Sequence, residues 1–151
     1  MKFNASDLNP ELFLKRANKE AEEIYSKPST RKNRTKAQIL ETVLYGHAAE
    51  VYLIEYHNFK DDERKYKDVF DTEGNSIEVK VTEGEYYVEH VLDRAVEDKK
   101  QPWRKFSNIL YIFIGDKMTA DYSLHGIYKW NGKKFDLQKA KTMVYYIDND
   151  K

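Results

Sequence analysis

The spacing of apolar residues predicts an amphipathic helix near the start of the chain. Asn9 is suited to cap it, Pro10 lies in its first turn, and Lys27-Pro28-Ser29 ends it. Four apolar residues recur at helical spacing within it: Phe13, Ala17, Ala21 and Ile24. This stripe predicts one buried face.

A second helix is predicted from residue 35 to about residue 56. Thr35 and Gln38 have the spacing of a capping box at its start. The stripe that follows is long: Ala37, Leu40, Val43, Leu44, His47, Val51 and Ile54. We therefore expect a core helix. The stretch from Lys27 to Arg34 has no such period and is predicted to be irregular.

The period then changes to two, which predicts strands at 66–71 and 76–82. Gly74 stands where a three-residue hairpin loop needs a left-handed residue, so the loop should pair Asp71 with Asn75. Counting back along both strands places Asp68 opposite Glu78. Cross-strand partners share a face of a sheet, and so does the residue two positions on, Lys80.

The rest of the chain predicts one helix and several further strands. A helix is expected from Glu85 to about Lys100, ended by Gln101-Pro102. The apolar run 108–115 reads as a central strand covered on both faces. Asn131-Gly132 predicts a hairpin between strands 122–130 and 133–137, and 143–147 could add a last strand. The pattern indicates an α/β fold in which helices flank one mixed sheet.

Composition narrows the classes of function. The 151 residues suit a single domain, and the absence of cysteine excludes disulfide scaffolds, thiolate zinc sites and cysteine nucleophiles. No apolar run is long enough to span a membrane, and the first residues lack the apolar centre of a signal peptide. We therefore expect a soluble cytoplasmic protein with no membrane partner.

The charges cancel overall but are unevenly placed. The chain has 26 Lys and Arg against 26 Asp and Glu, yet 61–98 holds 13 acidic and five basic residues, a net charge of −8. Three basic runs, 27–36, 99–105 and 129–141, carry most of the balancing charge. An acidic centre between basic flanks is compatible with a metal pocket among phosphate-binding segments, so neutrality does not exclude nucleic acid.

Four residues are predicted to lie close together and to form a candidate catalytic site. Asp68 and Glu78 should project side by side, Lys80 lies next to Glu78, and Glu50 stands at the edge of the apolar stripe of the second helix. Two carboxylates at cross-strand distance repel each other unless a positive charge lies between them. Magnesium takes such oxygen ligands.

These residues resemble the PD-(D/E)XK nuclease superfamily: Gly46-His47-Ala48-Ala49-Glu50 on a helix, Asp68 on a strand, then Ile77-Glu78-Val79-Lys80. Lys67 stands where the family name has proline. The resemblance implies a restriction-endonuclease-like fold with a catalytic core at 35–115, between an N-terminal helix and basic segment (1–34) and C-terminal strands (116–151).

The resemblance also implies a function, that of a magnesium-dependent endonuclease acting on DNA, in which Mn²⁺ is expected to substitute. Asp68 and Glu78 would be metal ligands, Glu50 a direct or water-mediated ligand, and Lys80 the water-activating residue. The basic runs would hold the phosphate backbone: Lys27, Arg31, Lys32, Arg34, Lys36, Arg104 and Lys105. A homodimer is possible, with the aromatic region 122–146 as its interface.

Several alternatives stay open. Asp71 could replace Asp68, and Glu55 is a further helix carboxylate, whereas His47 is expected to be a buried structural histidine. His57, His90 and His125 show no metal-ligand spacing. Arg94 and Gln101 lie where the family often has a phosphate contact, and four aromatic residues could stack on bases or simply pack: Tyr25, Tyr86, Tyr87 and Trp103.

Three other readings compete with the DNA endonuclease. Glu78 and Lys80 could simply form the exposed face of an edge hairpin, with Asp68 paired to Lys80. Separately, the zero net charge is compatible with a noncatalytic nuclease-fold binding or inhibitor module. A nuclease acting on RNA or branched DNA would use the same four residues.

Overall fold

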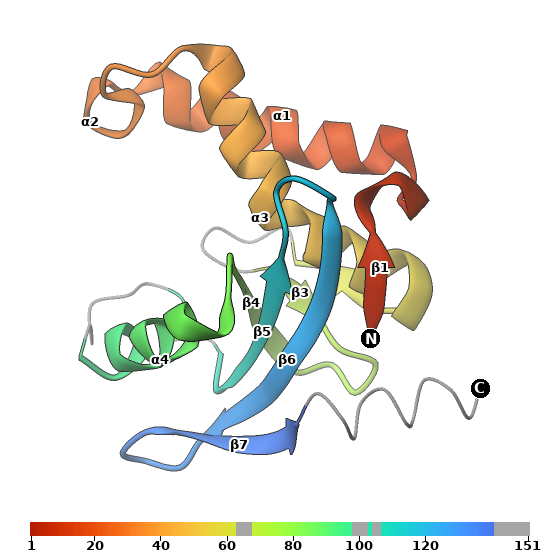
Figure 1. The fold of residues 1–151 in the computed structure, drawn as a ribbon, viewed down its shortest axis with the longest axis vertical. Coiled ribbons are helices and arrows are strands. Elements are labelled where there is room, and N and C mark those ends of the chain that lie inside the picture. Colours follow the sequence, from red (N-terminus) through yellow and green to blue (C-terminus); the bar gives the residue numbers. More distant parts are fainter. Residues whose placement is uncertain (63–67, 98–102, 104–106, 141–151) are drawn as a thin grey trace.

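A mixed β-sheet forms the centre of the molecule (Figure 1). The structure is a computed structural model and describes residues 1–62, 68–97, 103 and 107–140. The strands are β1 (Lys2–Asn4), β2 (Lys60–Asp61), β3 (Val69–Phe70), β4 (Ser76–Thr82), β5 (Ile109–Gly115), β6 (Asp121–Trp130) and β7 (Phe135–Ala140). Their order is β1-β6-β5-β4-β3-β2, and β7 also pairs with β6. Among these described strands, β4 and β5 pair in parallel and the other neighbouring pairs are antiparallel. The mixed α/β class is therefore confirmed.

The two predicted N-terminal helices are present with their predicted caps. They are α1 (Pro10–Ser26) and α3 (Lys36–His57), and the Asn9 side chain accepts hydrogen bonds from the amides of Glu11 and Leu12. Thr35 and Gln38 form the reciprocal capping box at the start of α3. The prediction for 27–34 was wrong in part, because Pro28–Arg31 forms a one-turn helix, α2. Proline at the first position of a helix supplies the dihedral angle that a helix needs.

The helices form layers on the sheet. α1 packs along α3 through a cluster of small and branched side chains: Ala17, Ala21, Ile39 and Val43. α3 in turn packs on one face of the sheet, where Leu53, Ile77 and Phe113 are fully buried. Fully burying such a side chain contributes about 1.5–3 kcal/mol. α1, α2 and the first half of α3 extend beyond the sheet at the top of Figure 1.

The second face of the sheet is covered by α4 (Val88–Glu97), which follows the short 3₁₀ helix Glu85–Tyr87. Leu110 and Ile112 of β5 point to this face, whereas Tyr111 and Phe113 point to the α3 face. Strand β5 is therefore covered on both sides, as its uninterrupted apolar sequence predicts. Residues 98–100 of the predicted helix lie outside the described residues.

The hairpin before the sheet centre has the predicted register. Asp71 donates its amide to the carbonyl of Asn75, and Gly74 has a φ of +85°, a left-handed conformation that glycine adopts without strain. The ladder pairs Val69 with Ile77 and Phe70 with Ser76. Strand β3 is shorter than predicted, and residues 66–67 of the expected strand lie outside the described residues.

The C-terminal hairpin around Gly132 is also confirmed, in β6 and β7. The sequence pattern did not predict the short edge strands β1 and β2, while the expected strand at 143–147 lies outside the described residues. Within the described part of the chain, no helix is long and apolar enough to cross a membrane.

Candidate active site

Asp68 lies where the pairing of β3 and β4 stops. The hydrogen-bonded pairing of β3 with β4 ends at Val69 and Ile77. Beyond this point the amide of Val79 in β4 has no backbone acceptor on β3 and needs another one. The Asp68 carboxylate supplies it: its Oδ2 accepts from the amide of Val79 at 2.8 Å. The Asp68 carbonyl accepts from the amide of Asp62 at 3.2 Å. Asp68 is therefore held against β4 between Glu78 and Lys80.

Glu78 and Lys80 alternate with the core residues of β4. Ile77 and Val79 point to the α3 face, so the pleat sends Glu78 and Lys80 to the other side of the strand. Glu78 is buried, and its Oε1 lies 3.5 Å from Lys80 Nζ. The Lys80 side chain is 38% exposed, and its ammonium lies 5.8 Å from the centre of the Trp103 ring. Lys80 thus reaches from a buried carboxylate toward solvent.

Glu50 approaches from the opposite layer. It lies on α3, is 5% exposed, and its Oε1 accepts a hydrogen bond from Arg16 Nη2 of α1 at 2.9 Å. The same nitrogen lies 3.1 Å from Asp61 Oδ1 and donates weakly to the Asp68 carbonyl at 3.4 Å. Arg16 therefore connects the helix carboxylate to the strand segment that carries Asp68.

A histidine and a glutamate complete the charged cluster. His47 Nε2 hydrogen-bonds the Glu20 carboxylate of α1, and His47 Nδ1 lies 3.9 Å from Glu50 Oε2. Burial opposes the positive charge of His47, but the bond to Glu20 and the charges of Glu50 and Glu20 raise its pKa. The hydrogen bond from His47 lowers the pKa of Glu20. The positive charges of His47, Arg16 and Lys80 lower this pKa further.

The acidic groups of the cluster destabilise one another's charge. Burial, with the negative charge of Asp68 next in importance, raises the pKa of Glu50 to about 8 despite the attraction of His47 and Arg16. Burial and Asp68 likewise raise the pKa of Glu78 well above its ordinary value, against the attraction of Lys80. Asp68 is thus the residue that acts on both glutamates. Buried like charges with displaced pKa values are typical of functional sites.

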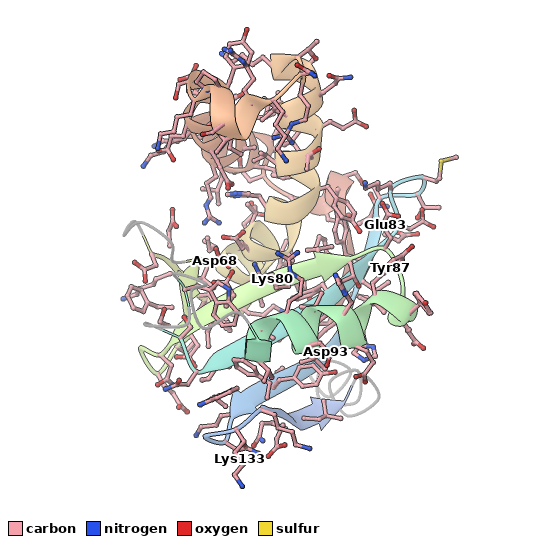
Figure 2. The ribbon with its side chains drawn as sticks, turned by 90° about the vertical axis from the view of Figure 1, so that its left-hand side faces the viewer. Asp68, Lys80, Glu83, Tyr87, Asp93 and Lys133 are labelled. Carbon is pink, nitrogen blue, oxygen red and sulfur yellow. The ribbon has the colours of Figure 1, made fainter. Side chains whose placement is uncertain are left out.

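The structure brings the four predicted residues into one electrostatic cluster; Figure 2 shows Asp68 and Lys80 beside each other along β4. The edge-hairpin reading is wrong, because β4 is an inner strand and Glu78 is buried. Asp68 bonds the Val79 amide instead of forming the Lys80 pair which that reading expected.

The alternative carboxylates have structural partners. Asp71 accepts from the amides of Glu73 and Asn75 and so stabilises the hairpin turn. Glu55 accepts the amide of Asn9 at 2.8 and 3.0 Å and holds the start of α1. His57 pairs with the Tyr52 hydroxyl, away from the cluster.

The predicted nucleic-acid residues gather at the free end of the α1–α3 pair. Arg31 lies over the Tyr25 ring at 5.2 Å, Arg34 donates to the Thr30 carbonyl, and Lys36 pairs with Glu22. Lys27 and Lys32 are exposed on the same segment. Arg104, Lys105 and Gln101 lie outside the described residues.

The aromatic candidates divide by exposure. Tyr86 is 89% exposed and Tyr25 and Tyr87 are partly exposed, whereas Trp103 is buried in the α4 cluster and is not accessible for stacking. Arg94 is exposed on α4. Tyr122 and Tyr128 of the suggested dimer surface are buried within the chain, and residues 141–146 of that surface are not described.

The roles of Arg16, Glu20 and Asp61 in the cluster were not predicted from the sequence. A signal was present for the first two, because they are four residues apart and border the stripe of Ala17 and Ala21. A helix whose apolar stripe packs on α3 brings such bordering charges to the same interface. Asp61 had no comparable signal, since β2 was not predicted.

The donor set fits a hard divalent cation in chemistry, since Asp68, Glu78 and Glu50 offer carboxylate oxygens. In the described part of the chain, no group of three or more His, Cys, Asp or Glu side chains is arranged to hold a metal ion. Arg16 and Lys80 instead provide the positive charges nearest to Glu50 and Glu78. A divalent ion bound here would share Glu50 with Arg16 and Glu78 with Lys80.

Comparison with known proteins gives no assignment. No protein-family model matches the chain, and no match is found among curated proteins or solved structures.

Proposed function

We propose that this protein is a divalent-metal-dependent endonuclease that hydrolyses phosphodiester bonds in DNA and has a restriction-endonuclease-like fold. One observation carries the proposal: burial and the negative charge of Asp68 raise the pKa of both Glu50 and Glu78, and Glu78 lies 3.5 Å from the partly exposed Lys80. A stable fold gains nothing from burying like charges, and such strain is commonly retained at functional sites.

Asp68 and Glu78 are the proposed ligands of Mg²⁺, with Mn²⁺ as a substitute, and Glu50 binds directly or through water. Mg²⁺ when bound supplies a Lewis acid that neutralises phosphate charge and lowers the pKa of a coordinated water. Ionised Asp68, Glu78 and Glu50 provide the negative charge that holds the cation. Their raised pKa values mean that binding releases protons from the glutamates.

Lys80 is the proposed water-activating residue. Its ammonium is close enough to Glu78 to be oriented by it, while the exposed part of the side chain can reach a substrate at the surface. In this position Lys80 can hold and orient the attacking water. The Trp103 ring beneath it limits the directions in which the ammonium can point.

The basic end of the α1–α3 pair is the proposed site for the DNA backbone. The side chains of Lys27 and Lys32 are exposed, and Arg31 is held by Tyr25. Lysine and arginine at a surface bind phosphates without reading sequence. This segment leads directly into the helix that carries Glu50, so it can orient DNA toward the cluster.

The test is nicking of supercoiled plasmid with Mg²⁺ or Mn²⁺. Asp68→Asn and Glu78→Gln should abolish nicking, while the matched control Asp93→Asn, an exposed acid of α4 labelled in Figure 2, should retain it. Single-stranded DNA, branched DNA and RNA are included, because the same four residues could serve those substrates. Failure of the unmutated protein to cut any of them with either ion would refute the enzymatic proposal.

A noncatalytic nuclease-fold module is the second candidate. Arg16 already pairs with Glu50, so the charge of this carboxylate can be compensated without a metal ion. Calorimetric titration with Mg²⁺ distinguishes the two functions. A binding module predicts no saturable heat that depends on Asp68, whereas the nuclease predicts one.

A further inference from the structure

Arg16 occupies an unusual place in the cluster. One of its nitrogens, Nη2, faces Glu50, Asp61 and the Asp68 carbonyl at 2.9, 3.1 and 3.4 Å. The side chain is 11% exposed, so these contacts lie largely out of water. A guanidinium in such a position supplies the positive charge that Glu50 needs to ionise.

The second terminal nitrogen of Arg16 has no such partners. Nη1 is buried and makes no hydrogen bond in the described structure, and the same is true of His47 Nδ1 beside Glu50. A buried donor without an acceptor costs about 1–3 kcal/mol. Arg16 is thus well bound on one side and poorly satisfied on the other, which favours a second arrangement of this side chain when the cluster changes its charge.

From this geometry we infer that Arg16 is the built-in counter-cation of the carboxylate cluster and competes with a divalent cation for Glu50. The inference rests on the proposed function, since it concerns the same carboxylates. Two carboxylates of the cluster already have partners: Arg16 Nη2 lies 2.9 Å from Glu50 Oε1, and Asp68 Oδ2 accepts the Val79 amide at 2.8 Å. Binding of the divalent ion would then release Arg16 from Glu50.

The inference predicts an effect of definite sign. If Arg16 competes with the metal ion, replacing it by a neutral residue should tighten metal binding. If Arg16 only positions Glu50, the same replacement should weaken metal binding, because a ligand loses its support. Removing Arg16 also strengthens proton binding by the cluster, but a divalent ion feels the missing charge twice as strongly as a proton does.

The experiment is calorimetric titration of Mn²⁺ into Arg16→Gln, Arg16→Lys and the unmutated protein at one fixed pH. Arg16→Gln should bind Mn²⁺ about tenfold more tightly, because a unit charge within about 4–6 Å changes cation affinity by at least that factor. Arg16→Lys, which retains the charge, should bind close to the unmutated value. The matched control is Lys19→Gln, an exposed lysine on α1, which should have no effect.

Arg16→Gln leaves Glu50 buried beside Asp68 and could fail to fold, so a second measurement uses the unmutated protein. This measurement uses Mg²⁺, which is diamagnetic, in place of Mn²⁺. The NMR signals of the Arg16 side-chain NH groups are assigned by their loss in Arg16→Lys. They should exchange with water faster in the Mg²⁺-saturated protein than in the metal-free protein. Weaker or unchanged Mn²⁺ binding by folded Arg16→Gln, or unchanged Arg16 exchange on saturation with Mg²⁺, would overturn the inference alone. Absence of metal binding by the unmutated protein would instead overturn the proposed metal site and, with it, the inference.

Discussion

Replacing Glu50 by glutamine should stabilise the metal-free protein, by an amount that grows with pH. Burial and Asp68 raise the pKa of Glu50 from 4.5 to about 8. The folded state therefore retains a proton that the unfolded state has lost between these two pH values. The contribution of such an acid to the free energy of unfolding is therefore fully present below pH 4.5 and is lost as the pH rises toward 8.

The size of this effect follows from the shift. Each pKa unit corresponds to about 1.36 kcal/mol, so Glu50 makes unfolding easier by about 1.4 kcal/mol for every pH unit within the window. Glutamine has nearly the same shape and no charge to bury. Glu50→Gln should match the unmutated protein near pH 5 and exceed its stability by about 2–4 kcal/mol near pH 8. The lower limit allows for a weaker bond between glutamine and Arg16.

The assay is urea unfolding followed by tryptophan fluorescence at several pH values, with EDTA present to remove metal ions. Glu83→Gln is the matched control, because Glu83 is 55% exposed and pairs with the surface residue Lys117. Its effect should stay within about 1 kcal/mol at every pH. If Glu50→Gln is no more stable than the unmutated protein near pH 8, the carboxylate cluster is not electrostatically strained and the argument for a functional site fails.

Three further predictions concern other parts of the molecule. Mg²⁺ should raise the unfolding midpoint of the unmutated protein in proportion to the logarithm of its concentration, and should not do so in Asp68→Asn; equal shifts in both would place the ion elsewhere. Thr35→Ala should lower the unfolding free energy by about 1 kcal/mol through loss of the capping box, with plasmid nicking retained; no change in urea midpoint would contradict the cap. Lys27→Gln with Lys32→Gln should reduce the slope of DNA affinity against the logarithm of salt concentration by up to about 2, whereas an unchanged slope would remove these residues from the interface.

Much of the fold could be predicted because its signals are local. Asn9, Thr35 and Gln38 cap helices through side chains within three residues, and Gly74 fixes the hairpin register through its own backbone. Strand β5 reads as central because every residue in its apolar run must be covered. The short strands β1 and β2 depend on partners far away in the sequence, so no local pattern marks them.

The part of the candidate site that depends on local structure could also be predicted from the sequence, whereas the part that depends on helix packing could not. Asp68, Glu78 and Lys80 follow from the hairpin register, which is a local property. The contacts of Arg16 and Glu20 depend on how α1 packs on α3, and a helical period gives a buried face without naming its neighbour. The direction in which Glu50 approaches β4 also depends on that packing. Tertiary contacts, not local propensity, decide these parts of the site.

The central claim is that this carboxylate cluster and Lys80 cut DNA. Lys80→Ala tests it most directly, since Lys80 is proposed to activate water and not to hold the metal ion. Lys117→Ala is the matched control, because Lys117 is 57% exposed, pairs with Glu83 and lies outside the three basic runs. In a single-turnover nicking assay with saturating Mg²⁺, Lys80→Ala should bind the ion and cut at least about a hundredfold more slowly, as expected on loss of a group that assists proton transfer. The control should cut at the unmutated rate; equal cleavage by Lys80→Ala would contradict the account.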